Sequence, residues 1–276
     1  KQSTRTSQAT NEATAFVNLL LEASGNHSGE HAENHSGASI YVMLTLRSDF
    51  LGDCAQFRDL PEALNDNQYL IPRMAREQRR RVIEGPIAVA EGEITPRLVS
   101  QLLNDVGDNP DQLPVLQHAL MRTWNQWEAA QTPDKPLDLP HYQAIGGMDD
   151  ALSIHADEIY LALDPKTQRV AEKLFKCLTE KGPDNREIRR PTPLADVCAV
   201  AGATPEDVSR VVEAFRAPGR TFVMPPAGIE LTEERILDIS HESFIRVWQR
   251  LKHWVDDEAQ SAQTYCRLAQ TAALQA

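Results

Sequence analysis

One short apolar run constrains the fold of this chain more than any other feature. Residues 40–46, IYVMLTL, are rich in β-forming residues and apolar except for Thr45. This composition is typical of a strand that is buried on both faces of a sheet. The sequence has no second run of this kind, and one strand cannot form a sheet alone. We therefore expect the partner strands to lie upstream of Lys1, in a longer protein of which this chain is a part.

Helical periodicity dominates the remaining sequence. Apolar residues recur every three or four positions over residues 11–23, 95–106 and 113–130, as on one face of an amphipathic helix, and residues 76–84 are also expected to be helical. Thr95 followed by Pro96 is typical of an N-cap and the first helical position. The fold class predicted from these patterns is mainly α.

The second half of the chain has the pattern of a winged helix. Two helices broken by Gly202 predict a helix-turn-helix, and two short apolar runs separated by Pro225, Pro226 and Gly228 predict a β-hairpin wing. The expected helices are residues 148–162, 165–179, 192–201, 204–216 and 242–255, and the expected strands are 221–224 and 236–239. Residues 256–276 continue the helical pattern.

Charge and cysteine usage exclude several classes of protein. The sequence has 28 Lys and Arg against 40 Asp and Glu, which gives a net charge of −12. This charge argues against a protein whose whole surface binds nucleic acid or an anionic membrane. The sequence has neither a signal peptide nor an apolar run long enough to span a bilayer. Its four scattered cysteines favour reduced thiols, and therefore a cytoplasmic location.

Two motifs suggest a ligand but favour a simpler explanation. His27, His31 and His35 lie four residues apart, as zinc or nickel ligands on a helix would. Gly29 and Gly37 argue against a rigid helix there, so we favour a solvated loop over a metal site.

The candidate recognition helix of the helix-turn-helix is acidic. It carries three acids, Glu206, Asp207 and Glu213, against Arg210 and Arg216, a net charge of −1. Helices that enter the major groove bring an excess of Arg and Lys, so DNA is a disfavoured partner. No nucleophile, zinc-protease or P-loop motif is present in the sequence, and no catalytic residue is predicted.

The order of these features resembles the C-terminal part of a bacterial STAND-type signalling NTPase, related to the NACHT and NB-ARC families and often carrying WD repeats downstream. The resemblance is carried by LTLRSDFLGDCAQF, QYLIPRM, DQLPVLQHALMRTW, HYQAIGG and DISHESFIRVWQRLKHWVDDE, which lie within residues 40–265. It implies a fragment of the α/β P-loop core followed by a helical lid and a winged helix. The implied domains are a core remnant (1–58), the lid (59–147), the winged helix (148–255) and a helical linker to a downstream module (256–276).

The resemblance also assigns roles to four residues. Arg47, after the expected strand, is similar to the sensor arginine that reads the terminal phosphate of ATP, a role suited to a forked guanidinium. Pro114 resembles the proline of the lid GxP motif, which packs against adenine, although Gln112 stands where that motif has glycine. His241 and Glu242 are similar to the His-Asp pair of the MHD motif, whose histidine contacts the β-phosphate of ADP.

The function implied is that of a regulatory part of a nucleotide-switched ATPase. Lid and winged helix would hold the ADP-bound closed state, with ATP or ADP and Mg²⁺ bound in the parent protein. Walker A and Walker B are absent from this sequence, so we expect this segment alone to bind no cofactor. The expected partners are an upstream NTPase core and a downstream sensor or repeat domain, with a homo-oligomer as a further option. The alternatives are a winged-helix DNA-binding regulator and a helical protein-interaction scaffold.

Overall fold

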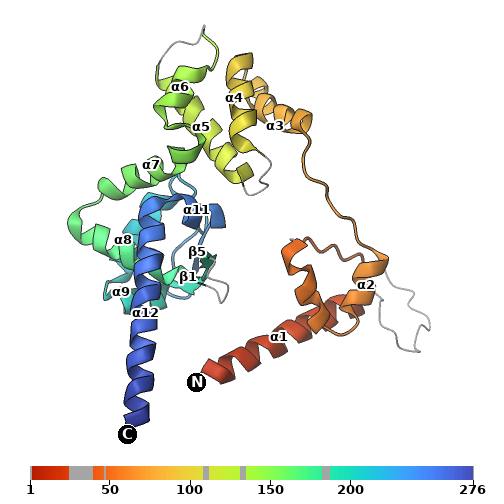
Figure 1. Ribbon diagram of the computed structural model, residues 1–276, viewed down its shortest axis with the longest axis vertical. Helices are drawn as coiled ribbons and strands as arrows, with labels where there is room; N and C mark the ends of the chain where they lie inside the picture. Colours follow the sequence, from red (N-terminus) through yellow and green to blue (C-terminus); the bar gives the residue numbers. More distant parts are fainter. Residues whose placement is uncertain are drawn as a thin grey trace. The chain divides into compact units, whose positions relative to one another are not determined.

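The computed structural model describes residues 2–24, 40–46, 48–107, 112–130, 135–181 and 187–275. It consists of two compact units, Lys1–Pro72 and Arg73–Ala276 (Figure 1). Helices predominate in both units, and the strands of the described residues are short and antiparallel. The prediction of a mainly α fold is confirmed.

The first unit contains three helical segments around a small apolar core. They are α1 (Gln2–Ala23), the 3-10 helix η1 (Ser48–Gln56) and α2 (Leu60–Asp66). Leu21, Cys54 and Leu60 are buried at its centre. Helix α1 begins nine residues before the predicted start at residue 11, where the sequence predicted Asn11 as the cap, so Asn11 lies inside the helix.

The expected buried strand is absent from this unit. Residues 40–46 have no strand assignment, and every residue of the run except Val42 is exposed. Tyr41 and Met43 are 92% and 89% exposed. A strand is stabilised by hydrogen bonds to a neighbouring strand, and none of the described residues supplies one to this run. The run is therefore largely exposed in this chain, as expected where its partner strands lie outside it, and a buried strand in the parent protein stays a prediction.

The second unit begins with a helical part, α3 to α6. Its elements are α3 (Arg76–Val89), α4 (Pro96–Val106), α5 (Leu113–Ala129) and α6 (Leu139–Ala144). Thr95 caps α4 as predicted, because its hydroxyl oxygen accepts a hydrogen bond from the Leu98 amide at 3.3 Å. Asp138 caps α6 and also accepts from the Thr95 hydroxyl at 2.6 Å, which ties the starts of both helices together. The Arg97 guanidinium holds the pKa of this carboxyl well below its usual range.

The strand-bearing part, α8 to α11 with β1 to β5, completes the unit. Helices α8 (Pro165–Cys177), α9 (Leu194–Ala201) and α10 (Pro205–Arg216) match three predicted helices, and Gly202 forms the turn after α9 with φ of 61°. The strands are β1 (Thr179–Lys181), β2 (Glu187–Arg189), β3 (Thr192–Pro193), β4 (Val223–Met224) and β5 (Ile236–Ile239).

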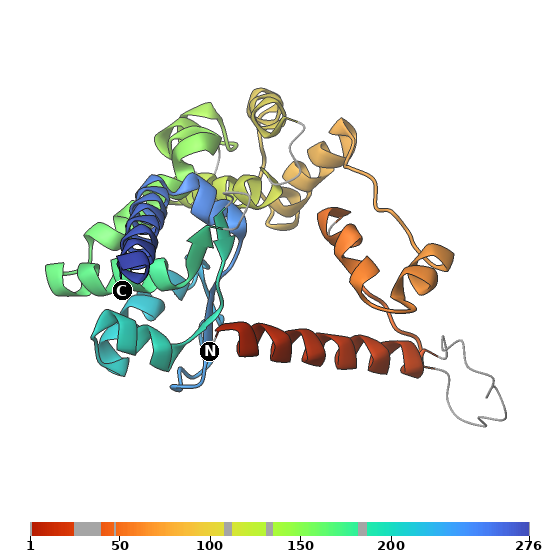
Figure 2. The same ribbon diagram turned by 60° about the horizontal axis from the view of Figure 1, so that its bottom comes forward.

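Two antiparallel sheets follow from these strands. Strands β1 and β2 pair as a hairpin, which the sequence analysis missed, and β3, β5 and β4 form a second sheet in that order. In the predicted pair of β4 and β5, Val223 lies opposite Ile239. Helices α9 and α10 contact β3 and β4, and Figure 2 shows the helix pair beside the strands.

The helix expected over residues 242–255 is broken at Trp248. Helix α11 (Glu242–Val247) ends there, and α12 (Gln249–Gln275) begins in a new direction. The break is fixed by helix α7 (Gly147–Leu161). The Trp248 indole donates to Asp157 at 2.9 Å, and the Gln249 amide donates to the Ser153 hydroxyl at 3.3 Å. These contacts are with residues more than 90 positions away, so periodicity could not predict the break.

Arg216 fixes the loop between β4 and β5 on helix α10. Its side chain is 3% exposed. The guanidinium pairs with Glu213 and donates to the carbonyl oxygens of Pro225, Pro226 and Ile229 at 3.2, 3.1 and 2.8 Å. Because hydrogen bonds from a charged donor contribute more than neutral ones, this one buried guanidinium holds the loop against α10.

We predict that Arg216→Ala lowers the free energy of unfolding by about 3 kcal/mol, because it removes a buried guanidinium together with its three hydrogen bonds to the loop. Arg210→Ala is the matched control on the same helix. Its guanidinium is exposed and lies 3.8 Å from Asp207, so the loss should stay below about 0.5 kcal/mol. Urea denaturation of both variants measures the difference, and equal losses would contradict the assigned role.

Candidate functional site

His241 caps the helix that follows the last strand. It lies between β5 and α11, and its Nδ1 accepts a hydrogen bond from the Ser243 amide at 3.1 Å. The Ser243 hydroxyl oxygen lies 2.9 Å from the same nitrogen. Because Nδ1 acts as the acceptor, the neutral imidazole carries its proton on Nε2. The cap therefore fixes both the tautomer of His241 and the direction of its Nε2–H donor.

Glu242 occupies the first turn of α11. Its carboxylate pairs with Arg246 one turn later, at 3.4 Å, and its side chain is largely buried. An acid in the first turn is stabilised by the helix dipole, and the ion pair holds the side chain along the helix. Glu242 thus supports the helix that presents His241.

Pro114 lies in the first turn of α5, at the edge of an apolar groove. The groove has a volume of about 640 Å³ and runs between α3 and α5. Pro86, Ile87, Leu113, Met121 and Trp124 are among the residues that line it. Apolar walls with few polar groups suit a flat aromatic ring, and the rigid proline presents a preformed face to one.

The remaining residues predicted for the site lie elsewhere. Arg47 lies outside the described residues, as do His27, His31 and His35. In the described part of the chain, no group of three His, Cys, Asp or Glu side chains is arranged to hold a metal ion. Pro114 lies in the first turn of α5, and the His241–Glu242 pair lies at the start of α11.

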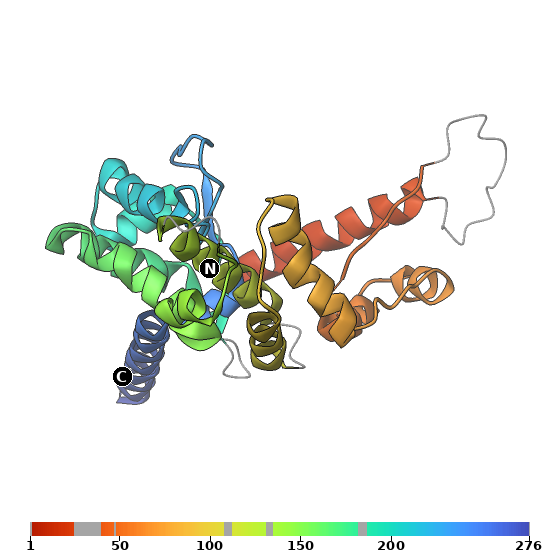
Figure 3. The ribbon, with the colours of Figure 1, turned by 90° about the horizontal axis from the view of Figure 1, so that it is seen from above.

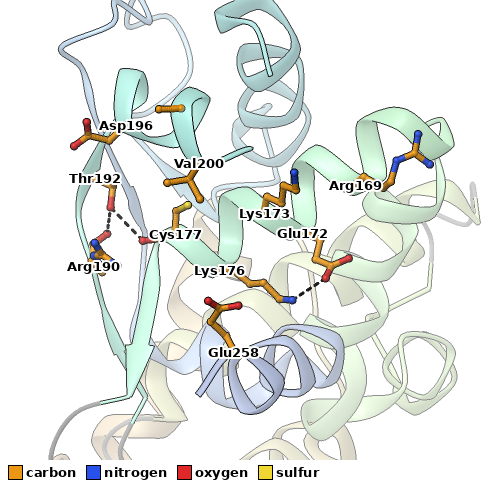
Figure 4. Close-up of a pocket in the computed structure, with 11 residues that line it drawn as sticks. Arg169, Glu172, Lys173, Lys176, Cys177, Arg190, Thr192, Asp196, Val200 and Glu258 are labelled. Atoms are coloured by element: carbon orange, nitrogen blue, oxygen red, sulfur yellow. Dashed lines mark hydrogen bonds and ion pairs between the residues drawn. The ribbon is translucent and has the colours of Figure 1, made fainter. Parts of the chain in front are cut away.

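A second pocket, which the sequence analysis did not find, lies between α8, α9, β3 and α12. Its volume is about 620 Å³, and Figure 4 shows the charged side chains of α8 along one side of it. Lys176 pairs with Glu172 at 2.9 Å, and Lys173 donates to the Ala201 carbonyl at 2.8 Å. Burial raises the pKa of the Cys177 thiol, which keeps it protonated and poorly nucleophilic.

The charges of this second pocket largely cancel. Arg169, Lys173, Lys176 and Arg190 are balanced by three acids, Glu172, Asp196 and Glu258. The i, i+3, i+4 and i+7 spacing along α8 was the only sequence signal for this face. We therefore assign the pocket a structural role.

Three basic residues around the helix-turn-helix, Lys166, Arg189 and Arg216, make contacts within the protein. Lys166 pairs with Asp207 of α10 at 2.7 Å, and Arg189 pairs with Asp238 of β5 at 2.8 Å. Arg216, at the end of α10, is buried against the β4–β5 loop. Helix α10 therefore has little unpaired positive charge with which to bind the phosphate backbone of DNA.

Comparison with known proteins identifies the family. The family model described as Novel STAND NTPase 1 matches residues 2–274. No curated protein and no solved structure was found to match. No helix among the described residues is both long enough and apolar enough to cross a membrane. Because the family match covers nearly the whole sequence, the chain belongs to the novel STAND NTPase 1 family.

Proposed function

We propose that this chain is the regulatory part of a nucleotide-switched signal-transduction ATPase. The helical part acts as the lid, the strand-bearing part acts as a winged helix, and together they hold the ADP-bound closed state. The observation that carries the proposal is the cap at His241, because it directs the Nε2–H donor of that residue.

An imidazole donor suits a contact that must form and break. Nε2–H can donate to an oxygen of the β-phosphate, and a hydrogen bond to an anionic oxygen contributes about 1.5–3 kcal/mol. A weakly basic ring gives up this contact more readily than a permanently charged guanidinium would. Glu242 and its Arg246 partner keep α11 in place while the contact forms or breaks.

The groove beside Pro114 fits the base of the nucleotide. Adenine is flat and aromatic, and the groove offers the proline face together with Met121 and Trp124. Gln112 replaces the glycine of the GxP motif, and its side chain makes no capping hydrogen bond to α5. Arg47 reads the terminal phosphate in this proposal.

The chemistry of hydrolysis belongs to another part of the parent protein. Walker A and Walker B are absent from this sequence, so Mg²⁺ and the phosphates are held by an upstream NTPase core. Exchange of ADP for ATP releases the lid and the winged helix. The newly exposed surfaces then act on a downstream sensor or repeat domain, or form a homo-oligomer in the cytoplasm. The switch works because the two nucleotides bind the closed and open states with different free energies.

We predict that His241→Ala and His241→Asn both lower the ADP retained by the purified full-length protein about tenfold, because both remove the phosphate donor. Only His241→Ala should also lose about 1 kcal/mol of stability, since asparagine can still cap α11. Nucleotide extraction with chromatography measures the first effect, and urea denaturation measures the second. Retention of ADP by His241→Asn at the wild-type level would show that the cap alone matters.

We predict that Pro114→Ala weakens ADP binding to the full-length protein about fivefold, because the rigid face under the base is lost. Pro205→Ala is the matched control, since Pro205 begins α10 as Pro114 begins α5 and lines no part of the groove. Isothermal titration calorimetry measures both affinities. Equal affinities for the two variants and the wild type would exclude the groove as the adenine site.

A further inference from the structure

Two histidines meet where the helical part joins the strand-bearing part. His118 of α5 and His155 of α7 have Nε2 and Nδ1 3.3 Å apart, and their ring centroids lie 5.2 Å apart. The Phe222 ring lies 5.3 Å from each of them. Phe222 precedes β4 and stacks on Phe244 at 4.7 Å, so it is anchored in the core of the strand-bearing part. Three rings from three elements thus form one cluster.

The charged side chains that act on the two histidines are arginines. Arg122 of α5 acts on both histidines, and Arg220, just before Phe222, acts on His155. Glu158 of α7 is engaged with Arg122 through two contacts of 2.8 Å. Asp157, the next acid on α7, accepts from Trp248 and Arg250 instead. Neither of these two acids therefore pairs with a histidine ring of the cluster.

Burial adds to the effect of these cations. His155 is 6% exposed. Burial is the larger cause and the charge of Arg122 the next, and together they lower the pKa of His118 to about 4 and the pKa of His155 to about 3. Two neutral rings can share one N–H···N hydrogen bond, whereas two imidazolium rings at this distance repel each other. The cluster as it stands cannot hold two protonated histidines, and burial disfavours even one.

We propose that His118, His155 and Phe222 form an acid-sensitive joint between the helical part and the strand-bearing part, closed while both imidazoles are neutral and opened by their protonation. The ligand of this site is the proton. The inference stands on the geometry of α5, α7 and Phe222, and it does not depend on the proposed nucleotide switch.

The size of the effect follows from proton linkage. In an open joint the histidines regain the ordinary pKa of about 6.5. Between pH 7.5 and pH 5.5 the open form then binds protons that the closed form does not, so the closed joint loses stability as the pH falls. Each histidine shifts the equilibrium toward the open form about tenfold over this range, and the two together shift it about 100-fold. The shift levels off near pH 4, where the closed form also begins to bind protons.

Hydrogen exchange on this chain tests the joint. At pH 7.5 and pH 5.5, after correction for intrinsic exchange, peptides from α5, from α7 and around Phe222 should open up to about 100-fold more often at the lower pH. Peptides from α8 and the β1–β2 hairpin should show no such increase. The His118→Gln/His155→Gln variant keeps polar side chains that do not titrate, so its joint should open equally at both pH values.

His253→Gln is the matched control for loss of a titrating histidine. His253 lies on α12, is 78% exposed and takes no part in the cluster, so its variant should retain the wild-type pH dependence. If the double variant does not fold, His118→Gln alone should reduce the shift to about tenfold. Two results would overturn the proposal. One is an opening that still depends on pH in the double variant, and the other is exchange of the joint peptides only when the whole domain unfolds.

Discussion

The second unit depends on one helix that is buried in two cores at once. Met148 and Ala151, in the first half of α7, pack with the helical part, whereas Ala156 and Ile159, in the second half, pack with the strand-bearing part. Figure 3 shows α7 running from one part to the other. Each fully buried large apolar side chain contributes about 1.5–3 kcal/mol, so burial in the two cores holds α7 in place on both sides of the histidine joint.

Helix α7 also determines where α12 begins. Asp157 accepts from both the Trp248 indole and the Arg250 guanidinium, and that guanidinium lies 4.5 Å from the ring centroid of Tyr160 on α7. These contacts hold the break between α11 and α12 and so set the direction of the long C-terminal helix. The histidine joint lies on the same helix, at His155. A change in the contact between α5 and α7 therefore occurs on the element that also positions α12.

The sequence predicted the elements whose signals are local. Thr95 with Pro96 and Thr204 with Pro205 cap two helices, and Gly202 ends a third, because caps and turns depend on neighbouring residues. Contacts between distant residues determine what was missed, such as the break at Trp248, which depends on Asp157 and Ser153 of α7. The run over residues 40–46 has the composition of a strand, and the described residues provide no partner for it, so its burial in a longer protein stays a prediction.

The same distinction applies to the candidate sites. The position of His241 before α11 was predictable, because a short apolar strand followed by His-Glu and an amphipathic run is a local pattern. The groove beside Pro114 was not, because it forms only when α3 packs near α5. The pair of His118 and His155 was equally hidden, since the two residues are 37 positions apart and belong to different helical patterns.

Neither the contact of His241 with a phosphate nor the histidine joint has enough energy to reverse a conformational equilibrium alone. Reversing a two-state equilibrium from 1:99 to 99:1 requires about 5.5 kcal/mol of differential binding. One hydrogen bond from His241 to a phosphate supplies about 1.5–3 kcal/mol. Protonation of two histidines over two pH units supplies about 2.7 kcal/mol, the equivalent of a 100-fold shift. Each contribution is about half of what full reversal needs. A switch that uses only one of these two contacts therefore changes its populations partially. It approaches all-or-none behaviour only when the His241 contact and the histidine joint change together.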